Sequence, residues 1–316
     1  MADVINLEEA ELTEAPVEPQ PKPGDEREFT VEARAQWKTI LRRFRRHKLA
    51  MIASVVLILL TLWAFITPLF WKYGFADINT KMKSLPPSWD HPFGTDDLGK
   101  DVFARVMRGT QRSLEIALIV AILATVVGVT VGALAGFYGG WIDAVLMRMT
   151  DLVLILPLLI IVGVVSAGIP GAPWYAIPLM LGLFSWPLMA RITRGEFLSL
   201  REKEFVEAAR AVGSPNRRII FKHILPNLAG PIIVNATLTV AGAILIETAL
   251  SFLGLGVREP EVSLGLLINK YKNAFDTRPW LFWFPSIAIV LICLCVNFIG
   301  DGLRDAFDPK QNRVRS

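Results

Sequence analysis

The stretch 207-EAARAVGSPNRRIIFKHILPN-227 decides how this chain folds, because it is charged and amphipathic yet lies between apolar segments of membrane-crossing length. A protein embedded in lipid keeps an ordered polar hairpin at its surface mainly to contact a soluble partner. The alternative for this stretch is an ordinary surface loop whose charges are solvated. We therefore expect a membrane protein that presents a helical hairpin on one side of the bilayer.

Residues 201–212 predict the first helix of this hairpin. Phe205, Ala209 and Val212 recur at helical spacing and form one apolar stripe. The alanines in this segment are small, so a partner surface could approach it closely. Gly213 is placed to end the helix in the left-handed conformation that glycine favours.

A second short helix is expected to follow the glycine. Ser214 would be its N-cap, with Pro215 at its first position. The helix would continue to Leu225, and Pro226 would break it before the next apolar segment. The sequence thus predicts two short helices that meet at a sharp bend.

The whole chain has the composition of a membrane protein, with 53% hydrophobic residues among 316 and a mean hydropathy of +0.46. Four runs of 19 to 22 residues carry no charge, which matches the roughly 20 residues needed to cross about 30 Å of hydrocarbon. A large soluble core is the alternative, but soluble domains rarely contain four such runs. The runs are 49–70, 116–136, 228–246 and 280–300.

Two weaker apolar stretches, 152–169 and 174–190, are interrupted by prolines. Counting both predicts an all-α membrane protein with six transmembrane helices, whereas leaving out the shorter 174–190 stretch gives five. The predicted spans are about 49–70, 114–136, 148–169, 174–194, 228–252 and 280–300. They form a membrane domain over 49–303, with the polar loop 195–227 between the fourth and fifth spans.

The flanking segments are polar. Residues 1–30 are acidic and contain prolines, so we expect a disordered tail. Residues 31–48 predict a basic amphipathic helix at the membrane interface, although a plain basic flank for the first span fits equally well. Residues 304–316 form a second polar tail.

The distribution of Lys and Arg predicts the topology. With six spans, the segments on the side of both termini carry 20 of these residues and the opposite segments carry 11. This bias places both termini and the 195–227 loop in the cytoplasm. The net charge of +4 therefore reports membrane orientation, and binding of nucleic acid is not expected.

Two features within the spans predict helix packing. Ala124, Gly128, Gly132 and Gly136 recur at every fourth position and form a smooth groove where another helix can approach closely. Arg148 and Asp151 lie one turn apart and are expected to form a structural ion pair or a helix cap.

Three polar residues inside the spans are candidates for lining a transport pathway: Glu247, Asn235 and Asn297. A carboxylate in a membrane is costly and usually faces a cavity or a polar partner. Glu247 could contact the amino group of a substrate, or it could lock a helix end at the interface. The two asparagines could line the pathway or form hydrogen bonds between helices.

No catalytic or metal-binding constellation stands out. Cys293 and Cys295 face different sides of the last span, which argues against a disulfide or a metal site. The segment 94-GTDDLGKD-101 resembles a phosphate-binding loop, but it ends in Asp101, follows no strand and is acidic. We expect it to be a turn-rich cap that contacts an external partner or closes a channel mouth, or a purely structural turn.

Four motifs, in this order, give the chain a family resemblance. They are 91-HPFGTDDLGKD-101, the hairpin with its end 222-KHILPN-227, then 250-LSFLGLG-256, and 300-GDGLRD-305 followed by Asp308-Pro309. With them the chain resembles, over roughly 38–309, the permease component of binding-protein-dependent ATP-binding-cassette (ABC) importers. It is most similar to the second permease of the dipeptide, oligopeptide and nickel group. His223 replaces the aliphatic residue of the general pattern, as is usual in the peptide group.

The resemblance implies a type I importer permease fold in a prokaryotic plasma (inner) membrane, and a transport subunit rather than an enzyme. The cargo would be short peptides, or alternatively nickel, a metal chelate or another small solute. A self-contained secondary transporter would instead show repeated halves, and the sequence contains no internal repeat. The implied partners are a homologous second permease, two ATP-binding subunits, an external solute-binding protein and membrane lipid.

The resemblance also assigns residues. ATP and Mg would be bound by the ATPase subunits, so this chain is expected to hold no metal and no cofactor of its own. The residues assigned to ATPase coupling are Glu207, Ala208, Ala209, Arg210, Gly213, Leu225 and Pro226. The residues of the external signature loop are Gly94, Thr95, Asp96, Asp97 and Gly99.

Overall fold

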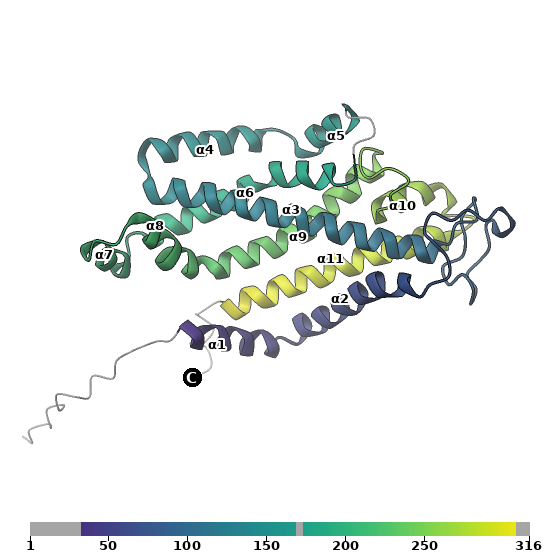
Figure 1. Cartoon of the computed structure of the whole chain (residues 1–316), viewed down its shortest axis with the longest axis horizontal. Coiled ribbons are helices and arrows are strands. Elements are labelled where there is room, and N and C mark those ends of the chain that lie inside the picture. Colours follow the sequence, from purple (N-terminus) through teal and green to yellow (C-terminus); the bar gives the residue numbers. More distant parts are fainter. Residues whose placement is uncertain (1–32, 169–172, 308–316) are drawn as a thin grey trace, which may run out of the picture. The chain divides into compact units, whose positions relative to one another are not determined.

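The computed structural model describes residues 33–168 and 173–307, and this part of the chain contains helices and connecting loops but no strand (Figure 1). The predicted tail 1–30 and most of the tail 304–316 lie outside the described residues. The α-helices are α1 (Ala33–Arg46), α2 (Lys48–Ile66), α3 (Val102–Tyr138), α4 (Gly140–Ile155), α5 (Leu158–Gly168), α6 (Ala176–Leu200), α7 (Glu204–Ala211), α8 (Asn216–Arg218), α9 (Ala229–Phe252), α10 (Leu264–Tyr271) and α11 (Pro279–Phe307).

Short helical turns complete the fold. A π-helical segment, η3 (Ile219–Ile224), and a 3-10 segment, η4 (Leu225–Leu228), connect α8 to α9. The other 3-10 turns are η1 (Thr67–Leu69), η2 (Thr80–Met82) and η5 (Lys272–Ala274).

Five helical runs are long and apolar enough to cross a membrane: Lys48–Leu69, Val102–Tyr138, Ala176–Leu200, Asn216–Phe252 and Pro279–Phe307. A sixth span exists only if the bent pair of α4 and α5 is counted as one. The prediction of an all-α membrane fold with five or six spans is therefore confirmed.

The span that is interrupted is 148–169 and not 174–190, which was expected to be the uncertain one. Residues 176–190 of the stretch 174–190 lie within α6, one continuous helix that accommodates Pro187 in its interior. The predicted span 148–169 is instead broken, with an angle of 74° between α4 and α5. Leu156 has extended backbone dihedrals there, as expected of a residue before proline, and Pro157 has no N–H to continue the helix.

α3 is much longer than the predicted span 114–136, because it begins at Val102 and has 37 residues. At 1.5 Å per residue it measures about 55 Å, well beyond the ~30 Å of hydrocarbon. The Asp101 carboxylate caps its first turn by accepting a hydrogen bond from the Ala104 N–H at 2.7 Å. The basic residues that follow Asp101 therefore belong to a helix and not to a loop.

The glycine groove of α3 is filled by α6, which runs beside it (Figure 1). A Cβ added to Gly128 would lie 2.6 Å from the Met189 Cβ, and one added to Gly132 would lie 2.4 Å from the Ala190 carbonyl oxygen. The groove thus lets two helix backbones approach closely, as the spacing predicted. α3 also packs on α9, and α2 packs on α11.

The ion pairs within the bundle differ from the expected one. Asp151 pairs with Arg191 of α6, at 2.5 Å from Nη2 to Oδ1, and not with Arg148. Asp143 of α4 pairs in the same way with Arg194, which lies one turn further along α6. Because α4 lies against α6, these carboxylates find partners across the helix contact rather than along their own helix.

The bundle has two ends that carry different loops (Figure 1). Residues 201–228 lie at one end, which we call the α7 end. Residues 71–101 and the segment from 253 to 278 with α10 lie at the opposite end, which we call the α10 end. The candidate sites below occupy these two ends and the space between α4, α6 and α9.

Candidate functional site

The hairpin at the α7 end contains the predicted glycine turn. Gly213 has φ +76° and follows α7. The Ser214 N–H donates to the Ala209 carbonyl at 3.0 Å and the Gly213 N–H donates to the Arg210 carbonyl at 2.9 Å. These two bonds form a Schellman motif, which closes a helix with a left-handed residue. The prediction that Gly213 ends this helix in the left-handed conformation is confirmed.

The second half of the hairpin differs from the prediction. Ser214 makes no N-cap bond, because Pro215 is the capping residue and α8 begins at Asn216. Pro226 does not break the helix, and helical structure continues from Asn216 to Phe252. The preceding π-helical turn, with a bond from the Leu225 N–H to the Ile220 carbonyl, and the 3-10 turn that holds Pro226 rearrange the backbone bonds around it.

The buried face of α7 is also not the predicted stripe. Val206 is fully buried among Phe197, Ile219 and Ile224, and Ala209 packs partly against this cluster. The Arg210 guanidinium lies 5.9 Å from the centre of the Phe137 ring at the end of α3. The apolar packing of Val206 and the contact between Arg210 and the Phe137 ring therefore hold the hairpin against the bundle.

Three large apolar side chains of the hairpin are exposed, although Phe221 also lines a cavity against α3 and α9. Phe205 is 40% exposed, Phe221 62% and Val212 86%. Glu207 and Ala208 are exposed on the same helix, and Pro226 is exposed while Leu225 is half-buried. The residues expected to couple to an ATPase therefore lie mostly on a surface that another protein could cover.

At the α10 end, the signature loop is a set of tight turns. Gly94 and Gly99 have φ of +72° and +76°, and a Cβ on Gly99 would lie 1.8 Å from the Asn79 carbonyl oxygen. Thr95 and Asp96 are fully buried, whereas Asp97 is exposed. The Asp96 Oδ1 accepts hydrogen bonds from the Leu98 and Lys100 N–H groups, both at 2.9 Å. The loop therefore directs its backbone donors at its own carboxylate.

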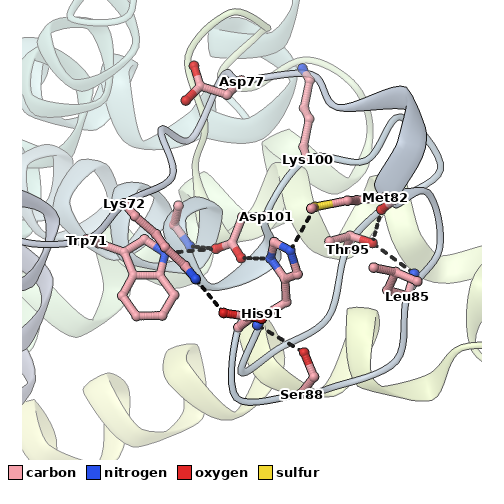
Figure 2. Close-up of polar contacts among 12 residues, drawn as sticks. Trp71, Lys72, Asp77, Met82, Leu85, Ser88, His91, Thr95, Lys100 and Asp101 are labelled. Carbon is pink, nitrogen blue, oxygen red and sulfur yellow. Dashed lines mark hydrogen bonds and ion pairs between the residues drawn. The ribbon is translucent and has the colours of Figure 1, made fainter.

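Asp101 organises the loop further (Figure 2). Its Oδ2 lies 2.6 Å from the His91 Nδ1, and its Oδ1 accepts from the Trp71 indole N–H at 3.3 Å. The His91 ring stacks on Tyr73 with centroids 4.5 Å apart. The same carboxylate caps α3, so it joins the loop to the start of that helix.

A buried arginine connects this loop to the segment that follows α9. Arg105 is fully buried. Its Nη1 donates to the Asp96 Oδ2 at 3.0 Å, and its Nη2 donates to the Glu259 Oε1 at 2.8 Å. Lys270 of α10 donates to the same Glu259 oxygen at 3.0 Å. The signature loop, α3, α10 and residue 259 are thus joined through two carboxylates.

A second carboxylate is held in the same way one turn further along α3. Glu261 accepts hydrogen bonds from Arg108 at 3.1 Å and from Arg112 at 2.9 Å. Arg112 also contacts Glu115 and lies 3.9 Å from the Trp174 ring centre. We call Asp96, Arg105, Arg108, Arg112, Glu115, Glu259, Glu261 and Lys270 the ion-pair network. One signal for this network is visible in the sequence, since residues 105, 108 and 112 share a helix face.

The electrostatic effect of the network appears in the pKa values of its carboxylates. Burial raises the pKa of Glu259, but hydrogen bonds from Arg105 and Lys270 outweigh it and hold the pKa at about 2. The hydrogen bond from Arg112 and that from Arg108 lower the pKa of Glu261 despite its partial burial. Both carboxylates are therefore ionised throughout the physiological pH range.

A cavity of about 590 Å³ lies between the α4–α5 bend, α6 and α9. Its walls are mostly apolar, with Ser185, Asn235 and Thr239 as polar groups. The Asn235 side chain donates to the Pro231 carbonyl at 2.8 Å. Asn297 is exposed on α11 and does not line this cavity.

Glu247 was predicted either to line the pathway or to lock a helix end. It is fully buried in α9 and lines neither this cavity nor the α10-end cavity described below. Its Oε1 accepts a hydrogen bond from Ser251 at 2.6 Å, and Ser251 contacts Ser263 at 3.3 Å. Burial against these hydroxyls corresponds to the alternative of a lock at the end of the helix.

Comparison with known proteins identifies the family. Residues 128–313 match the model for the binding-protein-dependent transport system inner membrane component, and residues 35–87 match the N-terminal transmembrane domain of oligopeptide transport permease C. The oligopeptide transport system permease protein OppC of Mycobacterium tuberculosis is 42% identical over 277 residues, covering 87% of this chain and 95% of the relative.

Two further relatives are similar over the same range. The OppC protein of Bacillus subtilis is 39% identical over 91% of this chain and 94% of its own length. The dipeptide transport system permease protein DppC of Alkalihalophilus pseudofirmus is 38% identical over 92% of this chain and 95% of its own length. The chain therefore belongs to the family of binding-protein-dependent transport system inner membrane components, and it is a multi-pass inner-membrane permease subunit of an ABC importer rather than an enzyme.

Proposed function

We propose that this chain forms half of the translocation pathway for short peptides, which an external solute-binding protein delivers and separate ATPase subunits drive. The relatives described above are named as oligopeptide or dipeptide permeases, and these names support peptides over nickel chelates as the cargo. The second half of the pathway would be a homologous permease.

The observation that carries this proposal is the exposed face of the hairpin at the α7 end. Phe205 and Val212 expose apolar surface there, while Val206 packs the hairpin against the bundle. An apolar face on a rigid helical hairpin is suited to fill a cleft on a soluble partner. We assign it to contact with an ATPase subunit, together with Glu207, Ala208 and Gly213.

The charge distribution supports an orientation with both termini and the hairpin in the cytoplasm. Three of the seven basic residues counted between 72 and 112, namely Arg105, Arg108 and Arg112, are on α3 and paired with carboxylates. The positive-inside rule counts Lys and Arg and not net charge, so this pairing does not change the count of 20 basic residues on the side of both termini against 11 on the opposite side, which supports the orientation. The α10 end would then face the exterior and the solute-binding protein.

The chemistry of ATP hydrolysis would lie outside this chain. ATP and Mg are proposed to bind the ATPase subunits, and this permease would bind no cofactor of its own. Closure of the ATPase pair would move the hairpin as a rigid body and switch the permease pair between inward-facing and outward-facing states. Asn235 in the cavity near the α4–α5 bend remains the candidate for lining the pathway.

The test is purification through a tag on this chain in mild detergent, followed by reconstitution of the retained complex into liposomes. We expect a second permease and ATPase subunits to be retained, and ATP-dependent uptake of peptides once the solute-binding protein is added. A chain that purifies alone and still transports without ATP would contradict the proposal. Uptake of a nickel chelate but not of peptides would contradict the assigned cargo.

A further inference from the structure

A second cavity lies at the α10 end. It measures about 430 Å³, within the range of small-ligand sites, and is enclosed by the end of α5, the start of α6 and the loop 256–261. Trp174, Ile177, Met180 and Val257 form apolar walls. The charged residues that line it are Arg258, Glu259 and Glu261.

By residue type the lining has an excess of negative charge, but both glutamates already have cationic partners. Glu259 is held by Arg105 and Lys270, and Glu261 is held by Arg108 and Arg112. None of these four cations lines the cavity. The network as a whole contains four carboxylates and four cations, so it contributes no net charge to the cavity.

Arg258 is the exception. It is exposed, and within residues 33–168 and 173–307 its guanidinium has no ion pair or hydrogen bond. The neighbouring segment 169–172 consists of Ile, Pro, Gly and Ala, so it contains no ionisable side chain. The cavity therefore presents one unneutralised cation beside an apolar wall.

We propose that Arg258 receives the C-terminal carboxylate of a peptide as it leaves the solute-binding protein and enters the permease. Arginine suits this task because its planar guanidinium offers paired donors to a carboxylate. Trp174 lines the same cavity as an apolar contact for the side chain of the last residue, and the Arg112 guanidinium, 3.9 Å from its ring centre, holds the ring in place.

The inference rests on the proposed function and adds a recognition rule to it. Every unmodified peptide carries one C-terminal carboxylate, whatever its sequence. A site for that group accepts many peptides and disfavours molecules that lack it. The alternative source of an oxyanion is the phosphate of a lipid headgroup at the membrane surface, and the experiment separates the two.

The experiment uses the complete transporter purified through this chain, with its solute-binding protein, in liposomes. ATP-dependent uptake of one peptide is measured with a free and with an amidated C-terminus, for the wild type and for Arg258→Gln. The solute-binding protein is the same in all four measurements. Its own preference therefore cancels when the acid-to-amide uptake ratio of the wild type is divided by that of Arg258→Gln. We expect the preference for the free acid to fall about fivefold in Arg258→Gln, the upper end for an exposed ion pair.

Two control variants accompany this cycle. Arg258→Lys keeps the charge but loses the paired donors, so its preference should fall between that of the wild type and that of Arg258→Gln. Lys83→Gln removes another exposed cation from the α10 end without touching the cavity and should behave as the wild type. Equal losses for the acid and the amide in Arg258→Gln, or no loss for either, would overturn the proposal. So would a loss seen only in liposomes with anionic lipid and shared by both peptides, which would assign the arginine to lipid phosphate.

A second measurement applies even if the amidated peptide is transported too slowly to compare. A peptide ending in the photoreactive residue benzoylphenylalanine is irradiated with the complete transporter, and the cross-links are mapped by mass spectrometry. We expect cross-links to residues 174–180 or 256–261 in the wild type and several-fold fewer in Arg258→Gln. Cross-links that are unchanged in the variant would refute the site. Failure of the wild type to transport any peptide would instead refute the proposed function.

Discussion

Asp96 and Arg105 are both fully buried, with the Arg105 Nη1 3.0 Å from the Asp96 Oδ2, although both residues are highly polar. Burial of two charges is tolerated because each has further partners. Asp96 accepts two backbone hydrogen bonds and one from the Tyr271 hydroxyl at 3.2 Å, and Arg105 also binds Glu259. The pair fixes the signature loop to α3 and to α10.

Removal of one partner of this pair should therefore be costly. We expect Arg105→Met to lower the free energy of unfolding by up to about 3–5 kcal/mol, because the buried Asp96 would keep only the more distant Lys270, at 3.7 Å, as its cationic partner among the described residues. Thermal unfolding of the purified complex in detergent measures the effect. The matched control is Asp90→Asn, which breaks the exposed pair with Lys72 and should leave the melting temperature unchanged. Equal stability of both variants would refute the structural role of the network.

Substitution within the glycine groove should separate α3 from α6. In Gly132→Ala the new Cβ would meet the Ala190 backbone oxygen at 2.4 Å, so a helix must shift, at a cost of about 1–3 kcal/mol. Gly195→Ala on α6 meets nothing within 4 Å and should be neutral or slightly stabilising. Melting temperatures of the two variants test the packing, and a Gly132→Ala protein as stable as Gly195→Ala would contradict it.

The hairpin surface offers a binding test that leaves the fold intact. Val212→Asp places a charge on a side chain that is 86% exposed, so the permease should remain folded while its contact with the ATPase weakens. We expect at least tenfold less ATPase retained on the tagged chain. Trp89→Asp alters a fully exposed side chain within residues 71–101 of the α10 end, and this variant should retain normal amounts of ATPase. Equal retention by both variants would show that this face does not contact the ATPase.

The Gly213 turn predicts a loss of coupling without a loss of folding. Alanine has free space at this position but must adopt φ +76°, at a cost of about 1–2 kcal/mol. The hairpin should then change its angle, so that Gly213→Ala hydrolyses ATP with less uptake per ATP. The ratio of uptake to hydrolysis measures this, and Gly195→Ala is the control. A normal ratio in Gly213→Ala would remove the turn from the coupling mechanism.

Acid should weaken the ion-pair network through Glu259. Its pKa is about 2 in the folded protein and near 4.5 without its partners, so its contribution is complete above pH 4.5 and is lost as the pH falls toward 2. Because the side chain is 43% exposed, the contribution is at most about 1 kcal/mol. The melting temperatures of the wild type and Glu259→Gln should differ at pH 6 and converge toward pH 3. A difference that does not change with pH would contradict this assignment.

The spans could be predicted because membrane crossing depends on local hydrophobicity and length alone. The effect of each proline could not, since Pro157 stands at a 74° break whereas Pro187 lies inside a continuous helix. The local sequence is apolar in both cases, and the neighbouring helices decide whether the freed carbonyl is accommodated.

Local features of the hairpin could be predicted from the sequence, whereas the long-range contacts of the ion-pair network could not. Gly213 was predictable because a helix end with positive φ is a local property. The buried state of Arg105 was not, because its partner Glu259 lies 154 positions away and only the folded chain brings them together. Likewise, the sequence shows that Glu247 is in a membrane helix, but Ser251 and Ser263 decide that it faces the interior.

α3 is one unbroken helix of 37 residues, and both of its ends are tied to a surface loop. Ala133 and Phe137 pack against the hairpin at one end, and Arg105 holds the segment around Glu259 at the other. Such a helix acts as a stiff lever about 55 Å long. A tilt of only about 5° displaces one end by roughly 5 Å relative to the other. A movement of the hairpin could therefore displace the residues at the mouth of the opposite cavity without any change within the helix itself.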